Sequence, residues 1–226
     1  MPRQVDHDAR RHDIAEIAAK LIARRGPDGA SLRSLATEAG WSTTAVTHYF
    51  ADKRELLQHA YRAALLHAQA RLVAIPDDHP DPLRASCEAV LPLDRPRRQD
   101  WQTWLAFFGA AVGDPSLAAM QRRRVKAFRD HLASIMSAEQ RAGRLPSGLD
   151  VALTARELLA VVHGIGSEAA FDSRDWPPAR QLEILDRALD RTRAPGGAIA
   201  SPVASRKPTK KSNNHLVESA STTRRG

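Results

Sequence analysis

Residues 31–50 read SLRSLATEAGWSTTAVTHYF, and they contain the strongest local signals for helix ends in the chain. Ser31 is a typical helix N-cap, and Gly40 is typical of the residue that follows a helix in the left-handed conformation. Ser42 or Thr43 then begins another short helix that runs to about Tyr49. Two short helices joined by a glycine turn predict a helix-turn-helix.

The second of these short helices has one polar and one apolar side. Ala45, Val46 and Phe50 are spaced to pack inward. The outward side chains are Thr43, Thr44, Thr47 and His48. They are short hydrogen-bonding groups, and threonine methyls can contact thymine methyls, so the polar side fits the major groove of DNA. An ordinary solvated helix has the same pattern, so the residues alone leave both interpretations open.

A longer segment, LRSLATEAGWSTTAVTHYFADKRELL at residues 32–57, resembles the DNA-binding signature of the TetR/AcrR family. The resemblance covers about residues 10–60. It implies an all-α fold, with an N-terminal three-helix helix-turn-helix domain and a C-terminal helical domain for ligand binding and dimerisation. It also implies a transcriptional regulator, typically a repressor that a small-molecule effector releases from a palindromic operator in double-stranded DNA.

The resemblance further implies DNA contacts for particular side chains. Ser31 and Arg33 are similar to family positions that contact the phosphate backbone or an adjacent base edge, while Tyr49 and Lys53 are similar to phosphate-binding positions. The residues that face the groove are implied to be Thr43, Thr44, Thr47 and His48. Trp41 is less usual in the turn, and two interpretations stay open: a packed turn residue, or a ring against the sugar-phosphate backbone.

Apolar periodicity and Gly or Pro breaks predict about nine helices. The expected ranges are 8–25, 32–39, 43–49, 53–73, 82–92, 98–112, 115–142, 149–171 and 178–193. We expect residues 1–56 to form the helix-turn-helix domain, with the fourth helix continuing to about residue 74 as a connector. Residues 75–194 would form the ligand-binding and dimerisation domain, and residues 195–226 a disordered basic tail.

The net charge of +8 is unevenly distributed along the chain. Residues 1–74 have 11 Lys/Arg against 8 Asp/Glu, residues 75–194 have 17 against 17, and residues 195–226 have 6 against 1. Basic ends suggest a polyanionic partner, although charge alone does not separate nucleic acid from a membrane surface. No apolar run approaches the roughly 18 residues that span a bilayer. We therefore expect a cytoplasmic protein with no membrane partner.

The C-terminal half contains two apolar stripes at helical spacing. One includes Trp101, Trp104 and Phe108, and the other includes Met120 and Phe128. They fit either the walls of a ligand pocket or plain core. On the pocket interpretation, Arg124 would suit an acidic ligand and Glu168 a cationic one. The candidate ligand-binding set is Trp101, Trp104, Phe108, Met120, Arg124, Phe128 and Glu168.

Residues 104–128, WLAFFGAAVGDPSLAAMQRRRVKAF, and residues 158–171, LLAVVHGIGSEAAF, resemble the betaine-operon repressor subgroup. This resemblance implies the shape of the C-terminal domain and, more weakly, a choline-like ligand.

The last two expected helices predict a dimer interface. The helix at 149–171 is apolar nearly all round and needs partners on two sides, and Leu182, Leu185 and Leu189 give the helix at 178–193 a seam of its own. A four-helix interface about a twofold axis would satisfy both helices. Packing within one chain is the alternative. The apolar positions of the first helix are Val151, Ala155, Leu158, Leu159, Val162 and Ile165.

Nothing in the sequence indicates an enzyme. It contains no P-loop, no G-x-S-x-G and no H-E-x-x-H pattern, and its single cysteine, Cys87, excludes a disulfide framework. We expect no catalytic residue, no metal site and no cofactor. A ligand-independent architectural DNA-binding protein is the main alternative. A small-molecule enzyme or binding protein with a degenerate DNA-binding domain is disfavoured by the presence of Tyr49 and Lys53.

Overall fold

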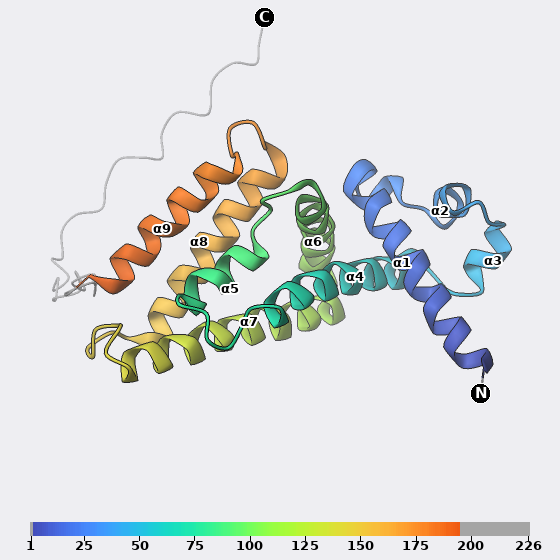
Figure 1. The fold of residues 1–226 in the computed structure, drawn as a ribbon. Coiled ribbons are helices and arrows are strands. Elements are labelled where there is room, and N and C mark those ends of the chain that lie inside the picture. The colour runs from blue at the N-terminus through green and yellow to red at the C-terminus, as the bar shows by residue number, and fades with distance from the viewer. Residues whose placement is uncertain (1, 195–226) are drawn as a thin grey trace, which may run out of the picture.

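The computed structural model describes residues 2–194, with side chains from residue 9 onward, and the expected basic tail at 195–226 lies outside them. The described residues form nine α-helices and no strand, which confirms the all-α prediction (Figure 1). The helices are α1 (Pro2–Gly29), α2 (Leu32–Ala39), α3 (Thr43–Thr47), α4 (Lys53–Val73), α5 (Pro82–Val90), α6 (Arg95–Gly113), α7 (Pro115–Arg141), α8 (Val151–Phe171) and α9 (Pro178–Arg193).

Helix α1 begins earlier than expected but is interrupted where the sequence predicts its end. The backbone at Gly26 leaves the helical region, with φ 71° and ψ 174°. Glycine adopts a positive φ without the steric cost that a Cβ would add. Pro27 then begins a separate short turn that ends at Gly29, because proline is compatible with the first position of a helix.

Local caps fix the helix-turn-helix. Ser31 Oγ accepts a hydrogen bond from Ser34 N at 3.0 Å, and Ser34 Oγ accepts one from Ser31 N at 2.8 Å. Gly40 ends α2 with φ 69°, and the hydroxyl oxygen of Ser42 accepts from the backbone of α3. Asp52 Oδ1 accepts from Glu55 N at 2.7 Å at the start of α4. Each such cap stabilises a helix by about 1 kcal/mol, so the orientation of α3 is largely set by local sequence.

The nine helices form two groups connected by α4 and α6. Figure 1 shows α1, α2 and α3 at one end and α5, α7, α8 and α9 at the other, with α8 and α9 lying side by side. Helix α4 runs from the first group into the second, and α6 stands between them. Helices α4 and α6 thus connect the C-terminal group to the helix-turn-helix.

Two apolar cores correspond to these groups, and the first extends beyond the N-terminal helices. It includes Leu21, Phe50 and Tyr61, together with Phe107 of α6 and Leu117 of α7. The rings of Tyr61 and Phe107 are stacked, with centroids 3.9 Å apart and planes 10° from parallel. The helix-turn-helix therefore shares its core with α6 and the beginning of α7.

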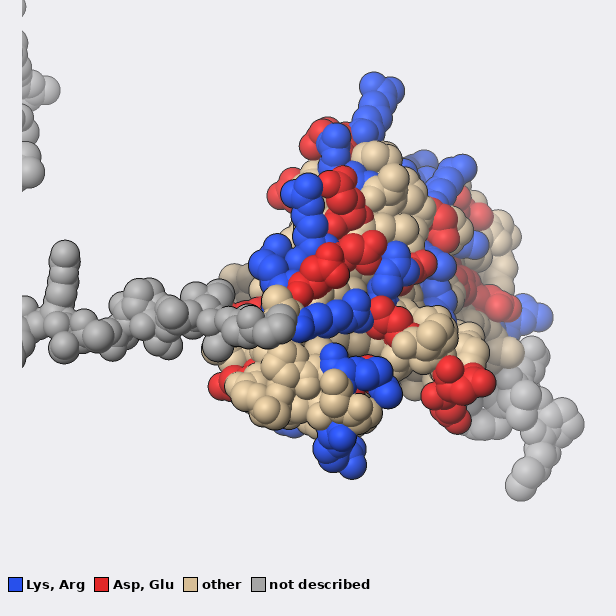
Figure 2. Space-filling model, turned by 60° about the vertical axis from the view of Figure 1, so that its left-hand side comes forward, with Lys and Arg blue, Asp and Glu red and all other residues tan. Residues whose placement is uncertain are grey.

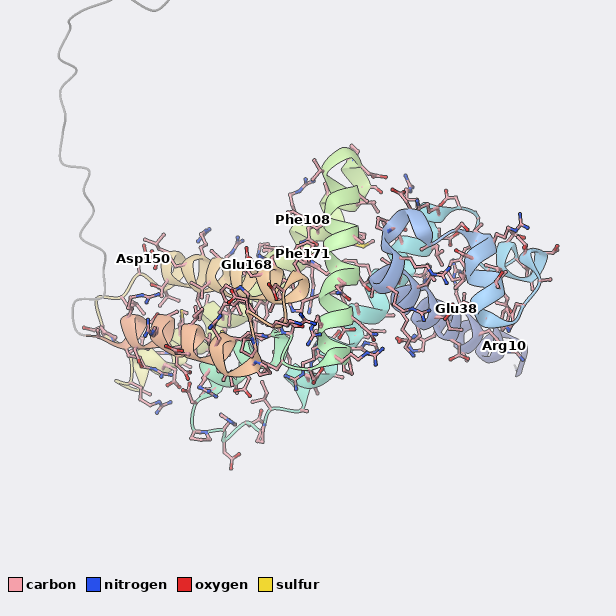
Figure 3. All side chains as sticks on the ribbon, turned by 90° about the horizontal axis from the view of Figure 1, so that it is seen from above. Arg10, Glu38, Phe108, Asp150, Glu168 and Phe171 are labelled. Carbon is pink, nitrogen blue, oxygen red and sulfur yellow. The ribbon has the colours of Figure 1, made fainter. Side chains whose placement is uncertain are left out.

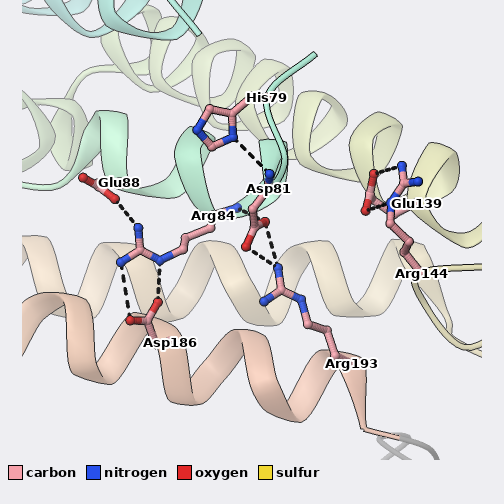
Figure 4. Close-up of polar contacts among 8 residues, drawn as sticks. All are labelled: His79, Asp81, Arg84, Glu88, Glu139, Arg144, Asp186 and Arg193. Carbon is pink, nitrogen blue, oxygen red and sulfur yellow. Dashed lines mark hydrogen bonds and ion pairs between the residues drawn. The ribbon is translucent and has the colours of Figure 1, made fainter. Parts of the chain in front are cut away.

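The second core joins α5, α7, α8 and α9. Cys87 is fully buried in it, and burial raises the pKa of its thiol to about 12, as expected for a cysteine with a packing role. At its surface, Arg84 Nε of α5 donates to Asp186 Oδ1 of α9 at 2.8 Å, and Arg193 Nη2 donates to Asp81 at 2.7 and 2.8 Å (Figure 4). Partly exposed pairs contribute modestly to stability, so they mainly orient α9 on α5.

The exterior of the C-terminal group has no single sign of charge. On the face shown in Figure 2, Lys and Arg are interspersed with Asp and Glu. This agrees with the balanced charge of residues 75–194. Within residues 2–194, no helix is both long and apolar enough to cross a bilayer.

Candidate DNA-binding face and ligand cavity

Helix α3 has the two sides that its sequence predicts. Val46 and Phe50 are completely buried in the first core. Thr47 Oγ1 donates to the carbonyl of Thr44 at 3.0 Å. The exposed side chains are Thr43, Thr44, Thr47 and His48. The face is therefore made of short polar groups and methyls on a helix anchored from behind.

Trp41 packs in the turn between α2 and α3. Its ring is half-buried against the first core and lies 5.9 Å from the ring of Tyr49. The guanidinium carbon of Arg10 lies 5.6 Å from the centroid of the Trp41 ring. Figure 3 shows Arg10 near the outer end of the N-terminal group. Arg10 thus adds a cation to this end of the molecule. Sequence reasoning missed it because Arg10 and Trp41 are far apart in the chain.

The other predicted DNA contacts flank α3. Ser31 and Arg33 are exposed at the beginning of α2, and Ser31 is also the α2 cap. Lys53 opens α4, and its Nζ lies 2.8 Å from Asp28 Oδ1. That hydrogen bond lowers the pKa of Asp28. Any phosphate that binds Lys53 must therefore compete with the Asp28 carboxylate.

A cavity of about 100 Å³ lies between α4, α6, α7 and α8. This is several times the space that one water molecule requires. Four of the predicted ligand residues line it, namely Trp101, Trp104, Arg124 and Phe128. The cavity also has polar lining residues outside the predicted ligand-binding set: Tyr61, Arg71, Asp100, Gln121 and His163.

Three predicted ligand residues lie outside the cavity lining. Phe107, rather than Phe108, takes the buried position on α6 against Tyr61, so Phe108 is 46% exposed at the outer side of Trp104. Met120 packs against the first core. Glu168 is exposed on α8, and Figure 3 shows it on the outside of the C-terminal group. The predicted stripes do lie on helices, but their spacing did not define which side of each helix faces the cavity.

The polar groups of the cavity form two clusters. In the first, Tyr61 Oη donates to Gln121 Oε1 at 3.0 Å and Trp104 Nε1 donates to the same oxygen at 3.3 Å. Burial raises the pKa of Tyr61 to about 12, so its hydroxyl remains a donor. Burial also lowers the pKa of His163, so the neutral form of its ring is favoured. This ring lies 5.2 Å from the ring of Trp104.

The second cluster surrounds Asp100. Its Oδ1 lies 2.9 Å from His67 Nδ1, and its Oδ2 accepts from Arg71 Nη1 at 3.3 Å. Burial raises the pKa of Asp100, and the contacts with His67 and Arg71 partly offset that increase. The carboxylate thus already contacts an imidazole and a guanidinium of the protein.

This second cluster continues to the DNA-binding end. Nε2 of His67 lies 3.1 Å from Glu16 Oε1 on α1. Close by, Thr103 Oγ1 of α6 donates to the carbonyl of Ala19 on α1 at 3.0 Å. Helix α6 therefore contacts the cavity with one side and α1 with another.

Helix α8 does not present its predicted apolar residues to solvent. Ala155, Leu158, Leu159, Val162 and Ile165 are buried within the chain, as are Leu185 and Leu189 of α9. Packing between α6, α7, α8 and α9 uses these side chains, so the seam proposed from the sequence is mostly internal. The outward face of α8 has other residues: Leu153, Ala160, Gly164 and Phe171, of which Phe171 is 82% exposed.

The chain matches two family models. Residues 14–60 match bacterial regulatory proteins of the tetR family, and residues 80–194 match the C-terminal domain of BetI-type transcriptional repressors. Among the described side chains, those of residues 9–194, no group of three or more His, Cys, Asp and Glu is arranged to hold a metal ion.

Individual proteins give the same result. The chain is 30% identical to the HTH-type transcriptional regulator PksA of Bacillus subtilis, over 76% of this chain and 84% of PksA. It is 27% identical to the HTH-type transcriptional regulator BetI of Burkholderia mallei, over 86% and 99% of the two chains. A solved transcriptional regulator from Saccharomonospora viridis, in complex with choline, has the same fold, with a TM-score of 0.72, 23% identity and 81% and 96% coverage.

Proposed function

The chain belongs to the TetR family of bacterial transcriptional regulators, which are DNA-binding proteins rather than enzymes, and from this we propose that it is a ligand-controlled repressor. A homodimer binds a palindromic operator through two copies of α3, and a small molecule in the cavity between α4, α6, α7 and α8 releases the operator. The observation that carries this proposal is the contact of α6 with both the cavity and α1.

DNA reading is assigned to the exposed side of α3. A rigid helix with short polar side chains can approach base edges closely, and Val46 and Phe50 hold it from behind. The phosphate contacts come from Arg33, Tyr49 and Lys53 around it. The remaining assigned contacts are Ser31, Thr43, Thr44, Thr47 and His48.

Dimerisation is assigned to the outward faces of α8 and α9. On α8, Leu153, Ala160, Gly164 and Phe171 recur at spacings of seven, four and seven residues, which puts them on one side of the helix. The small side chains at 160 and 164 allow the backbone of a second copy to approach. A twofold axis through this face would pair α8 with its own copy and bury Phe171.

Control follows from the position of α6. A molecule that enters the cavity contacts Trp101 and Trp104 on α6, and a small displacement of α6 is transmitted to α1 through Thr103. Two α3 helices read a palindrome together only when they are about 34 Å apart. A ligand that favours another spacing weakens operator binding, and the operator weakens ligand binding by the same factor.

Selection of binding sites from random duplex DNA tests the first part of this proposal. The expected product is an inverted repeat whose half-sites are one helical turn apart, bound by two chains. A product without a repeat, or binding with no sequence preference at all, would instead favour a ligand-independent architectural protein.

The dimer assignment has a separate test. Phe171→Asp should convert the dimer to a monomer in analytical ultracentrifugation, because it puts a charge into an apolar interface. Arg122→Asp, on the exposed side of α7 and outside the assigned interface, provides a control for added negative charge. If the Phe171→Asp variant remains dimeric, the interface does not include this face of α8.

A further inference from the structure

The cavity has an excess of positive charge. Asp100 is the one carboxylate among its described lining residues, and His67 and Arg71 already contact it. Arg124 also lines the cavity, and among the described side chains of residues 9–194 its guanidinium makes no hydrogen bond or ion pair. Its charge opposes the effect of burial on the pKa of Tyr61, which indicates that the two groups are near one another.

An unsatisfied donor lies beside this cation. Gln121 is 7% exposed, and its Oε1 accepts from both Tyr61 and Trp104, whose ring N–H can only donate. The orientation of the amide is therefore fixed, and its Nε2 is buried with no hydrogen-bond acceptor among the described residues. A buried donor without an acceptor is costly in native proteins and calls for an explanation. Gln121 and Arg124 are three residues apart, which puts them on the same side of α7.

We propose that the cavity binds a small apolar carboxylate. Its carboxylate accepts hydrogen bonds from Gln121 Nε2 and from the guanidinium of Arg124, and its apolar part packs against Trp101, Trp104 and Phe128. This assignment rests on the proposed function, because it takes the cavity as the effector site. One carboxylate group would provide both the acceptor that Gln121 Nε2 lacks and the negative charge that Arg124 lacks.

A quaternary ammonium ligand does not fit these groups as well, although the sequence resembles choline-responsive repressors. The carboxylate of Asp100 already contacts the His67 ring and the Arg71 guanidinium, and Glu168 lies outside the cavity. An ammonium group would also leave the Gln121 N–H without an acceptor and would add a second unpaired cation near Arg124.

Ligand binding to the full-length chain without DNA tests the proposal. Benzoate and octanoate, as aromatic and aliphatic carboxylates, are compared with benzyl alcohol, octanol and choline by thermal shift and isothermal titration calorimetry. At least one carboxylate should bind in preference to its neutral analogue and to choline. Binding by choline alone, equal binding of acid and alcohol, or no binding by either carboxylate would overturn the proposal.

Two variants identify the recognising groups. Arg124→Gln should weaken carboxylate binding by about 10- to 100-fold, the usual effect of losing a charged hydrogen bond. Arg123→Gln, the neighbouring exposed arginine, should leave it unchanged. Gln121→Glu should also abolish carboxylate binding, because it adds a negative charge and removes the donor. Unchanged affinity in Arg124→Gln would refute the assignment even if the Gln121 variant does not fold.

Operator binding by the same proteins separates this inference from the proposed function. A carboxylate that binds through Arg124 but leaves operator affinity unchanged would refute ligand control and retain the ligand class. Operator release by choline, with no carboxylate bound, would retain ligand control and refute the ligand class.

Discussion

Nε2 of His67 on α4 lies 3.1 Å from Oε1 of Glu16 on α1, while Nδ1 of the same ring lies 2.9 Å from Asp100 on α6. One imidazole thus bridges a carboxylate of the cavity wall and a carboxylate of the DNA-binding end. The His67 ring therefore places the cavity wall and α1 within ion-pair distance of the same side chain.

Removal of this bridge should reduce the response to ligand more than it reduces DNA binding. In His67→Ala, the factor by which a saturating effector weakens operator binding should fall by about 2- to 30-fold, the range for residues on a coupling route. Fluorescence anisotropy with and without effector measures this factor. Gln69→Ala, an exposed change on the same helix, is the control. Equal coupling in both variants would show that the bridge has no part in control.

Gly166 and Trp101 give a prediction about packing. A Cβ at Gly166 would lie 2.2 Å from the Trp101 ring, which lines the cavity. Gly166→Ala should therefore displace the ring, destabilise the chain by about 1–3 kcal/mol and weaken ligand binding.

Gly109→Ala is the matched control, because nothing lies within 4 Å of its added Cβ and the helix gains a better helix-forming residue. Urea unfolding and tryptophan fluorescence measure both effects. A Gly166→Ala protein as stable as the wild type, with unaltered fluorescence, would show that the close contact relaxes at little cost.

The DNA-binding face predicts two classes of variant. Lys53→Ala removes a phosphate contact, so it should weaken binding to all sequences and reduce the slope of log K against log salt by about 0.9. Thr44→Ala or His48→Ala should instead change which bases are preferred. Competition binding with operator variants at several salt concentrations separates the two. A change of base preference in Lys53→Ala would contradict this division of roles.

Asp28 provides a further check on Lys53. Asp28→Asn removes the carboxylate that lies 2.8 Å from Lys53 Nζ. Lys53 is then available to a phosphate without competition, so affinity for DNA of any sequence should rise modestly. An Asp28→Asn protein with weaker DNA binding would indicate that the ion pair instead orients Lys53 toward the phosphate.

The half-buried imidazole of His163 predicts a pH effect on stability. Burial lowers its folded-state pKa below the unperturbed 6.5, so on acidification the unfolded chain takes up a proton before the folded chain does. Stability should therefore fall as the pH decreases through about 6.5. Between about pH 7.5 and about pH 5.5, His163→Gln should lose less unfolding free energy than the wild type, because it lacks this group. Equal losses in urea unfolding would contradict the prediction.

Local signals made the helix-turn-helix predictable. Ser31, Gly40, Ser42 and Asp52 act through hydrogen bonds or dihedral angles within a few residues, so their roles are visible in the sequence. Which residues line the cavity, in contrast, depends on tertiary packing. Gln121 and Asp100 became cavity residues only because several helices pack around them, and no periodic pattern distinguishes a polar residue at a buried edge from one in solvent.

Helix α8 illustrates the same limit. Its apolar periodicity correctly indicated partners on more than one side, but the sequence did not tell which partner belongs to the same chain. Leu158, Val162 and Ile165 pack internally, whereas the exposed Phe171 was not among the residues expected at the interface.

The stacking of Tyr61 on Phe107 has a consequence for protein engineering. Because the first core includes side chains from α6 and α7, a fragment that ends at residue 56 would lose part of its own interior. The helix-turn-helix is therefore not a detachable module. Chimeric sensors that join it to another effector domain would have to reproduce the Tyr61 and Phe107 pair across the junction, and grafts that do not should emerge as insoluble or unfolded polypeptides.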